Sequence, residues 1–369
     1  MNRIKVLFFD FKNDKYKVLF FFILVFLTIF SVCSLQPKIA GDSLLYTESI
    51  EVIKTGIEPD GFIPMMILTT PLGLVLIMFF DLLFNNIAIS WVVLDAILYI
   101  VTGLFFYSLS KRIFSNSWVA FWGGVILMTN YAAVAFGMGY LMDMGGWLAY
   151  MASIYFSYRY LESEQKENKW LYFSSVSIGI GGLYKEYAFV AFVILFGVLV
   201  QTYWGKWRDL IIKTIIVGCL AFTPFILMNF YTFFTYNGYT YLDWFGHQRV
   251  YEYQNRLVEF IKSFGSIYNF GWFLFLPGFY LFIKKHKEVI RDKNLLFILL
   301  VILSSFAVLL WPVVTRVLFI TMPAVVLISS IFIQKMEKRF YFLLPIIFAY
   351  ILSGFLMDAY ILDFVNLPI

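Results

Sequence analysis

The sequence predicts an all-α fold, a polytopic bundle of transmembrane helices. Of the 369 residues, 62% are hydrophobic, 21% are aromatic and only 14% are charged. A soluble globular protein has roughly 45–50% apolar and about 25% charged residues. No water-soluble core can hide this much apolar surface, and no polar stretch is long enough to form a separate soluble domain. The composition therefore argues against soluble enzymes, nucleic-acid binders and disordered proteins, and it predicts one membrane-embedded domain over residues 1–369.

Apolar runs of the length that a membrane requires are the second observation. A transmembrane helix needs about 20 mostly apolar residues, and we expect about 11 spans, between about 9 and 13. The first run lacks a small-residue cleavage site and is followed by Gln36-Pro37-Lys38, so we expect an uncleaved anchor rather than a signal peptide. The runs are 18–35, 88–109, 118–137, 143–161, 170–184, 187–204, 210–232, 266–283, 294–312, 316–334 and 340–357.

The third observation is the distribution of basic residues, which predicts the orientation. Short connections rich in Lys and Arg stay in the cytoplasm, and residues 1–17 are such a segment. All the basic connections fall on one side if residues 62–84 do not cross the membrane. Pro64 and Pro71 favour a kinked juxtamembrane or re-entrant helix there, which leaves the C-terminus outside. The other basic connections are Lys111-Arg112, 159–169, 206–208, 284–293 and 335–339.

Two segments on the predicted outer side, residues 36–87 and 233–265, are too long to be simple turns. The inner connections are shorter. We therefore expect the functional site on the outer face of a multi-pass protein. The Lys/Arg asymmetry and the lack of an organelle signal favour the plasma (inner) membrane of a bacterium or archaeon.

An acidic group follows the first span. Asp42, Tyr46 and Ser49 are spaced for one face of a short helix that begins near Asp42. A carboxylate just outside a span can accept a proton from a substrate hydroxyl or hold a divalent cation. The alternative is that Asp42 merely caps a juxtamembrane helix.

A second acid, Asp143, is the only charged residue between Arg112 and Arg159. It lies at the predicted outer junction of two spans, in the glycine-rich stretch 137–146. The glycines would let the backbone approach a ligand or a neighbouring helix closely. The alternative is a helix N-cap at a tight outer turn.

Two basic residues are candidates for binding a phosphate. Lys185, followed by Glu186, separates two short apolar runs, which suggests a cation just under the outer headgroup layer, where a lipid-linked phosphate would lie. Arg316 begins an otherwise uncharged span, and its guanidinium can grip a phosphate at two points. The alternatives are that Lys185 snorkels to the interface or is neutralised by Glu186, and that Arg316 is an interfacial anchor beside Trp311.

The remaining candidates carry weaker signals. His247 and Arg249, in the outer segment 233–265, would reach a phosphate or a metal, although a lone loop histidine is more often solvated. Asp95 lies inside the second span with no partner visible in the sequence. Cys33 and Cys219 both lie in apolar runs, so neither a disulfide framework nor a cysteine metal site is supported.

Together these residues place two acids and two bases on one outer face of a helix bundle. This arrangement suits transfer from a membrane-bound phosphate donor, because cations hold the leaving phosphate while a carboxylate activates the acceptor. No Walker-type loop, GxSxG elbow or HExxH helix is present in the sequence.

The order of these features resembles the GT-C superfamily of integral-membrane glycosyltransferases, in the bacterial branch around the protein mannosyltransferases and lipid A aminoarabinose transferase. The resemblance covers most of the chain in layout but only about fifteen residues in motif. Ser43 stands where many members have a second acid. The stretches that carry it are Gly41-Asp42 with Tyr46, Asp143, Gly182-Leu183-Tyr184-Lys185-Glu186, and Arg316 with Pro323.

What the resemblance implies is an inverting hexosyl- or pentosyltransferase that uses a polyprenyl-phosphate-linked sugar. The acceptor would be a glycan, a lipid or a protein at the outer face. Asp42 would be the catalytic base, with Asp143 assisting, and Lys185 and Arg316 would hold the donor phosphate. Tyr46 and Glu186 would be further contacts. A divalent metal is an open alternative, with Asp42 as its contact.

Two other functions remain as alternatives. A polysaccharide polymerase or ligase would rely mainly on Arg249 and Arg256 and much less on Asp42. A transporter or flippase of a lipid-linked solute would need residues reachable from both faces, whereas the candidate chemistry gathers on one. The sequence also shows no internal repeat of the kind that marks an inverted-repeat transporter.

Overall fold

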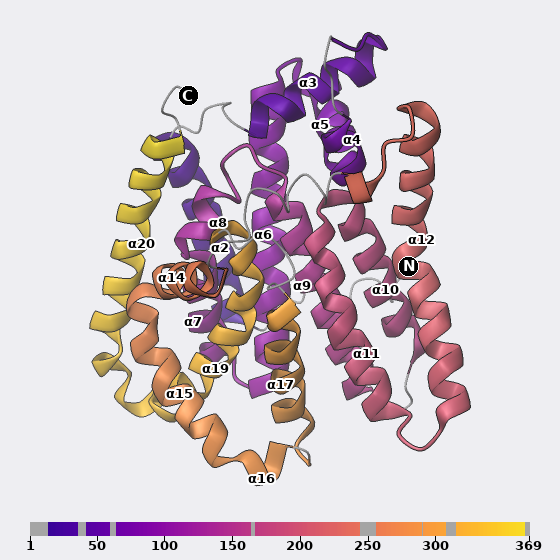
Figure 1. Ribbon diagram of the computed structural model, residues 1–369. Coiled ribbons are helices and arrows are strands. Elements are labelled where there is room, and N and C mark those ends of the chain that lie inside the picture. Colours follow the sequence, from indigo (N-terminus) through magenta and orange to yellow (C-terminus); the bar gives the residue numbers. More distant parts are fainter. Residues whose placement is uncertain are drawn as a thin grey trace.

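The computed structural model describes residues 14–35, 42–59, 64–163, 167–243, 256–289, 291–307 and 315–365. Every regular element in these ranges is a helix, which confirms the all-α prediction. Most of the long helices run side by side in one bundle, while α14 (Arg256–Tyr268) lies across it (Figure 1).

The first half of the bundle is built around α6. Asn86 and Asn116 begin α6 and α7, because each side-chain oxygen accepts a hydrogen bond from backbone N–H groups of the first turn, Asn86 from Ile89 at 3.1 Å and Asn116 from Trp118 at 2.9 Å. The helices in this half of the bundle are α2 (Lys15–Leu35), α6 (Ile87–Phe114), α7 (Ser117–Met128), α8 (Tyr131–Ala135) and α9 (Asp143–Glu162).

Three short helices precede α6: α3 (Asp42–Thr55), α4 (Met65–Thr69) and α5 (Pro71–Phe84). Pro71 begins α5, where its missing N–H costs nothing, and the chain kinks before it. The 14 residues of α5 extend about 21 Å at 1.5 Å per residue, short of a hydrocarbon core of about 30 Å. A tight turn at Asn85 then leads into α6, with which α5 packs. The geometry fits the re-entrant or juxtamembrane path expected for residues 62–84.

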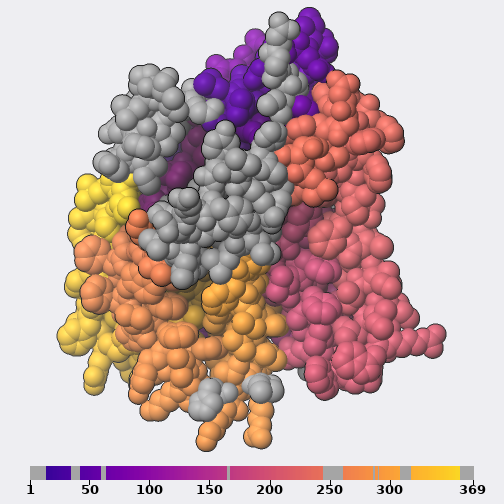
Figure 2. Space-filling model, in the orientation of Figure 1, coloured from indigo at the N-terminus to yellow at the C-terminus, as the bar shows by residue number. Residues whose placement is uncertain are grey.

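The middle of the chain packs as α10 (Asn168–Tyr184), η1 (Glu186–Val190), α11 (Ala191–Thr202) and α12 (Trp207–Thr235). Gly179 lets α10 approach α12 closely, since a Cβ at this position would lie 2.8 Å from the carbonyl oxygen of Leu220. The rest of α12 is exposed along the side of the molecule (Figure 2). Its exposed side chains are mostly Ile, Leu and Phe, as expected for a helix that faces lipid.

The last part of the bundle contains α14 and the helices after it. Gly278 on α15 packs against the backbone of α19, where an added Cβ would lie 2.3 Å from the carbonyl oxygen of Ile328. The further elements are η2 (Asn269–Gly271), α15 (Trp272–Lys284), α16 (His286–Val289), α17 (Lys293–Ser305), α18 (Thr315–Leu318), η4 (Phe319–Thr321), α19 (Met322–Lys335), η5 (Glu337–Phe342) and α20 (Leu344–Val365).

Within the described residues, each predicted span coincides with a helix or with helical segments in succession, and residues 308–312 of the span 294–312 lie outside them. Among the described residues, four helices are by themselves long and apolar enough to cross a membrane: Lys15–Ser34, Ile87–Phe114, Trp207–Thr235 and Ile261–Lys284. Several shorter apolar helices accompany them. The chain is thus a multi-pass membrane protein, and the total of about eleven spans remains a prediction.

The basic connections meet at one end of the bundle, as the sequence predicts. Hydrogen bonds and ion pairs join segments there that are far apart in the chain. They link Lys111 Nζ to Asp14 Oδ2 at 2.7 Å, Arg112 Nη1 to Glu162 Oε2 at 2.8 Å, and Asn116 Nδ2 to Glu337 Oε2 at 3.0 Å.

Candidate functional site

The candidate site lies at the end of the bundle that carries α3, opposite α16 (Figure 1). Four parts of the chain meet there: helix α3, the first turns of α6, the segment 136–142 with the start of α9, and the junction of α10 with η1. The sequence predicted three of these four. The contribution of α6 was not expected.

Lys185 lies where the sequence places it, between two short helical runs. Its backbone is extended, with φ −163° and ψ 126°, and this interrupts the helix after α10. Its ammonium donates a hydrogen bond to the hydroxyl of Tyr46 at 3.2 Å and lies 5.9 Å from the centre of the same ring. The contact joins the α10–η1 junction to α3 over a sequence separation of 139 residues.

The Tyr46 ring begins a short row of aromatic side chains. Its centroid lies 5.7 Å from that of Trp91 on α6, which in turn lies 5.8 Å from that of Tyr140. Tyr46 and Trp91 are fully buried. Burial raises the pKa of the Tyr140 phenol, so this group stays neutral at physiological pH. The row fixes α3, α6 and the segment before α9 in one arrangement.

Asp42 is the first residue of α3, and its side chain is half-buried. Tyr46 and Ser49, one and two turns further on, are both buried. The predicted short helix with these three residues on one face is therefore present. A carboxylate in the first turn also suits the positive end of the helix dipole, so the structure is consistent with both roles considered for Asp42.

Asp143 is more deeply placed than the sequence suggests. It begins α9 and its side chain has no exposed surface. The hydroxyl of Tyr187 donates to Asp143 Oδ1 at 3.0 Å and lies 2.8 Å from the Asp143 carbonyl oxygen. A side chain with no exposed surface is better placed to hold neighbouring groups in position than to react directly with an acceptor in solution.

Two glycines explain how the α10–η1 junction reaches the start of α9. A Cβ at Gly145 would lie 2.2 Å from ring atoms of Tyr184, and one at Gly146 would lie 2.7 Å from Cβ of Lys185. Real Cβ atoms do not approach so closely, so both positions require glycine. The predicted close approach is therefore to a neighbouring helix. Glu186, at the start of η1, is also buried.

The other predicted residues lie partly or wholly outside the described structure. Arg316 belongs to α18, but its side chain is not among those described. His247 and Arg249 lie outside the described residues. Within the described ranges, no group of three or more His, Cys, Asp or Glu side chains is placed to hold a metal ion.

Sequence reasoning missed Trp91, Tyr140 and Tyr187, and it did not place Asp95 beside the other candidate residues. Trp91 and Asp95 are four residues apart on α6, so they share one helix face, and this spacing is visible in the sequence. Tyr184 and Tyr187 flank Lys185 and Glu186. An aspartate one turn after a tryptophan, within an apolar run, was the signal in the sequence that could have located this helix face.

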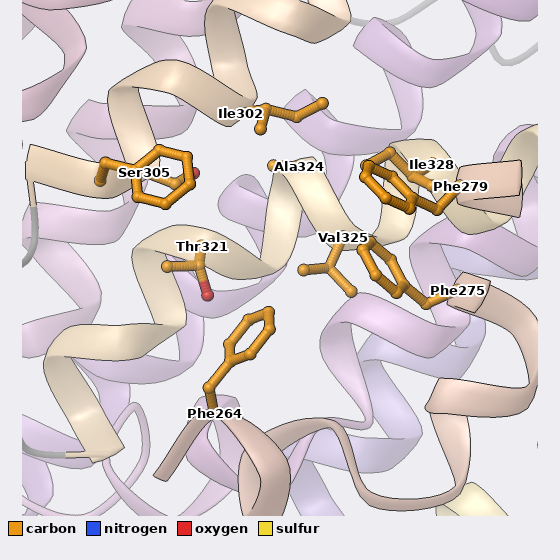
Figure 3. A pocket seen from close by; sticks show the side chains of 10 residues that line it. Phe264, Phe275, Phe279, Ile302, Ser305, Thr321, Ala324, Val325 and Ile328 are labelled. Carbon is orange, nitrogen blue, oxygen red and sulfur yellow. The ribbon is translucent and has the colours of Figure 1, made fainter. Parts of the chain in front are cut away.

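An apolar pocket lies beside α19, on the same side of the bundle as α14 (Figure 3). Its volume is about 230 Å³. The two hydroxyls in its lining, Ser305 and Thr321, donate to carbonyl groups of their own helices, at 2.9 and 2.7 Å. Phe264, Phe275 and Phe279 contribute rings to the wall. The pocket therefore offers an essentially apolar lining.

The fold and the site together define a helical membrane protein with a buried polar centre near one end. Residues 69–228 match the sequence model of a family described as dolichyl-phosphate-mannose-protein mannosyltransferase. This segment contains Asp95, Asp143, Lys185 and Glu186, whereas Asp42 and Arg316 lie outside it. No curated protein sequence matches the chain significantly.

The fold is similar to that in the crystal structure of ArnT from Cupriavidus metallidurans bound to undecaprenyl phosphate. The TM-score is 0.60 and the sequence identity is 14%. The likeness covers 87% of this chain and 60% of that chain, so the protein spans less than two thirds of the length of ArnT. The shared fold confirms the predicted helical architecture, and the family match over residues 69–228 supports the resemblance to the GT-C membrane glycosyltransferases.

Proposed function

We propose that the protein is a membrane glycosyltransferase that moves a sugar from a polyprenyl-phosphate-linked donor to an acceptor at the outer face. The observation that carries this proposal is the contact between Lys185 and Tyr46, one turn after Asp42. It brings a cation suited to a phosphate and a carboxylate suited to a hydroxyl to the same end of the bundle. The matched family and the lipid-phosphate-bound relative support the same class of reaction.

In the proposed reaction Asp42 is the catalytic base. It accepts the proton of an acceptor hydroxyl as the acceptor oxygen bonds to the anomeric carbon of the sugar. The bond between that carbon and the phosphate oxygen breaks, and polyprenyl phosphate leaves with the electron pair. Attack from the face opposite the phosphate inverts the anomeric configuration. General-base catalysis of this kind contributes about 10²- to 10⁴-fold to a rate.

Lys185 would stabilise the negative charge that builds up on the departing phosphate. An ammonium group has three N–H donors, and one of them points to Tyr46. Tyr46 thereby holds the Lys185 side chain in place before the donor arrives. Preorganised charge of this kind stabilises a transition state without reorganisation during the reaction. Arg316 is the second proposed phosphate contact, and Glu186, His247 and Arg249 are weaker candidates for the phosphate or the acceptor.

The apolar pocket beside α19 supports a lipid-linked donor. Arg316 precedes Thr321, a lining residue, by five residues, which is about 7.5 Å along an α-helix. A phosphate near Arg316 would thus leave the first prenyl units within reach of the pocket. The lining matches a hydrocarbon chain, since its two hydroxyls are already bonded to their own helices.

The orientation belongs to the same proposal. The end of the bundle with the basic connections would face the cytoplasm, with the N-terminus on that side and the site facing outward from a plasma (inner) membrane. The acceptor would be a glycan, lipid or protein on that outer face. Residues 1–369 would form a single membrane-embedded domain.

Release of polyprenyl phosphate tests the proposal. The purified protein in lipid nanodiscs would be incubated with synthetic polyprenyl-phosphate-linked sugars and with membranes from a strain that lacks the gene, as a source of acceptor. Lipid mass spectrometry should detect protein-dependent release, and Asp42→Asn should abolish it. Glu51→Gln, an exposed acid on the same helix, is the matched control and should keep full activity. Release by Asp42→Asn equal to wild type would contradict the base assignment.

A further inference from the structure

Helix α6 carries a carboxylate in the middle of an otherwise apolar stretch. The side chain of Asp95 is 1% exposed, and neither of its oxygens has a hydrogen-bond partner within the described part of the chain. Burying an unpaired carboxylate in ionised form costs far more than burying a neutral polar group. The presence of a buried carboxylic side chain without a hydrogen-bond partner therefore requires an explanation.

Contacts above and below Asp95 show what it faces. Trp91, one turn earlier on α6, packs against Tyr140. Thr102, about two turns later, places its hydroxyl 3.6 Å from the sulfur of Met144. Trp91, Asp95 and Thr102 share one face of the helix. Asp95 therefore lies opposite the segment that runs from Tyr140 to Met144, which contains Asp143.

The electrostatic contacts agree with this placement. Asp95 lies within electrostatic range of Asp143 on α9, of Tyr140 and of Tyr184 on α10. Buried polar atoms gather around it: Asp143 Oδ2, Tyr184 OH and Trp91 Nε1 have no hydrogen-bond partner among the described residues. The group is thus a polar centre enclosed by three helices.

The two carboxylates have different surroundings. Asp143 begins α9, at the positive end of the helix dipole, and Tyr187 donates a hydrogen bond to its Oδ1. Both features place positive potential or a hydrogen-bond donor at the Asp143 side chain. Asp95 lies inside α6 and receives neither kind of support. Two like charges close together in a low-dielectric interior cannot both persist, so one carboxyl group of such a pair retains its proton.

We propose that Asp95 and Asp143 share a single negative charge at neutral pH, with the proton on Asp95. Asp95 is then a positioning residue, and its O–H supplies the hydrogen-bond donor that Asp143 Oδ2 lacks. The carboxylate of Asp143, held between Tyr187 and Asp95, fixes the start of α9 against the junction that carries Lys185. The catalytic consequence rests on the proposed glycosyl transfer, whereas the shared charge does not.

Infrared spectroscopy tests the shared charge without any assay of activity. A protonated carboxyl group has a C=O stretching band that is distinct from those of a carboxylate and shifts in D₂O. The wild-type spectrum at neutral pH should contain such a band, and Asp95→Asn should remove it. Asp209→Asn, an exposed acid at the start of α12, is the control and should leave it in place. If the spectrum of Asp95→Asn keeps every protonated-carboxyl band of the wild type, the proposal is overturned.

Kinetics test the positioning role. Asp95→Asn keeps an N–H donor of similar shape, so transfer should stay within about threefold of wild type. Asp95→Leu removes the donor and should lower kcat about 10- to 100-fold, as a misplaced catalytic group does, with the KM for the lipid-linked donor unchanged. Asp143→Asn should abolish transfer both in the wild-type protein and in combination with Asp95→Asn. Activity of Asp95→Asn as low as that of Asp143→Asn would show that Asp95 must ionise, which contradicts the proposal.

The two tests separate this proposal from the proposed function. If the protein transfers no sugar, the infrared band still decides whether Asp95 carries a proton. If the band is absent while transfer depends on Asp42, the shared charge is wrong and the proposed function stands.

Discussion

At the scale of single residues, the proposed chemistry depends on Lys185, which the hydrogen bond to Tyr46 holds in place. Asp42 lies one turn before Tyr46, so the base and the cation are linked through a single helix turn of α3. The contact therefore brings the acid and the basic residue to the same end of the bundle although they are far apart in the sequence. It also lets the two roles be separated by substitution.

Lys185→Met should weaken binding of polyprenyl phosphate at least about tenfold, because a charge-assisted contact to the phosphate contributes about 1.5–3 kcal/mol. Native mass spectrometry in nanodiscs would measure the retained lipid. Lys54→Met is the matched control: Lys54 also lies near this end, but it is paired with Asp81 at 2.8 Å. Equal retention by wild type and Lys185→Met would remove Lys185 from the donor site.

The sequence identified the candidate site residues at this scale but not how deeply they are buried. Asp143 was placed at an outer turn, and the structure buries it under Tyr187. Asp95 was seen without a partner, because its neighbours come from helices far along the chain. Burial and long-range pairing depend on how helices pack, and the local pattern of one helix does not contain that information.

At the scale of elements, glycines set how closely the helices of the site approach. The most restricted is Gly145, where a Cβ would overlap the ring of Tyr184. The Tyr184 side chain is only 3% exposed, so it has little open space into which to move. The start of α9 and the end of α10 are therefore held at a fixed separation.

Gly145→Ala should destabilise the protein by about 1–3 kcal/mol, the usual cost of overpacking a core, and it should lower transfer because Lys185 follows Tyr184 directly. Thermal unfolding in detergent and the lipid-release assay would measure the two effects. Gly218→Ala on α12, where the nearest neighbour of a Cβ lies at 3.9 Å, is the control. An unchanged melting temperature for Gly145→Ala would show that the helices are not in close contact there.

A second element-scale contact joins α2 to α6 at the opposite end. Burial alone would raise the pKa of Asp14, but hydrogen bonds from Lys111 and Tyr107 outweigh burial and hold the pKa below its usual value of 3.8. A lowered folded pKa means that Asp14 stabilises the fold above pH 3.8 and that this stabilisation is lost as the pH falls through the folded pKa.

Asp14→Asn should therefore reduce the free energy of unfolding at pH 7 by about 1–3 kcal/mol. The difference between the variant and wild type should shrink as the pH falls below 3.8. Chemical unfolding at a series of pH values would measure both quantities. A difference that stays constant across this range would show that the charge of Asp14 contributes nothing.

The sequence predicted element positions well because apolar runs fix the length of a membrane helix. It did not predict the break in the helix where a polar side chain interrupts such a run. Residues 118–137 read as one span, yet the chain breaks after α7 because Asn130 caps α8 and donates to the carbonyl of Ile267 and the hydroxyl of Tyr350. The partners of Asn130 are over 130 residues away in the sequence, so the break is set by tertiary structure.

At the scale of the whole molecule, the protein has two chemically different ends. One gathers the basic connections, and the other gathers α3 and the candidate site. This separation agrees with the charge distribution along the sequence, and the excess of Lys and Arg at one end predicts that this end faces the cytoplasm.

Cysteine labelling would test the orientation. In a Cys33→Ser/Cys219→Ser background, Glu58→Cys should react with a membrane-impermeant maleimide on intact cells. Lys338→Cys should react only after the cells are permeabilised. The reverse pattern would invert the proposed topology and place the site in the cytoplasm.

The central claim is glycosyl transfer that depends on Asp42, and the glycans of living cells test it most directly. A strain that lacks the gene would be complemented with wild type or Asp42→Asn at matched membrane levels, and its surface and lipid-linked glycans would be analysed by mass spectrometry. The account predicts that wild type restores one defined sugar and that Asp42→Asn does not. Identical glycans in the deletion, wild-type and Asp42→Asn strains would contradict it.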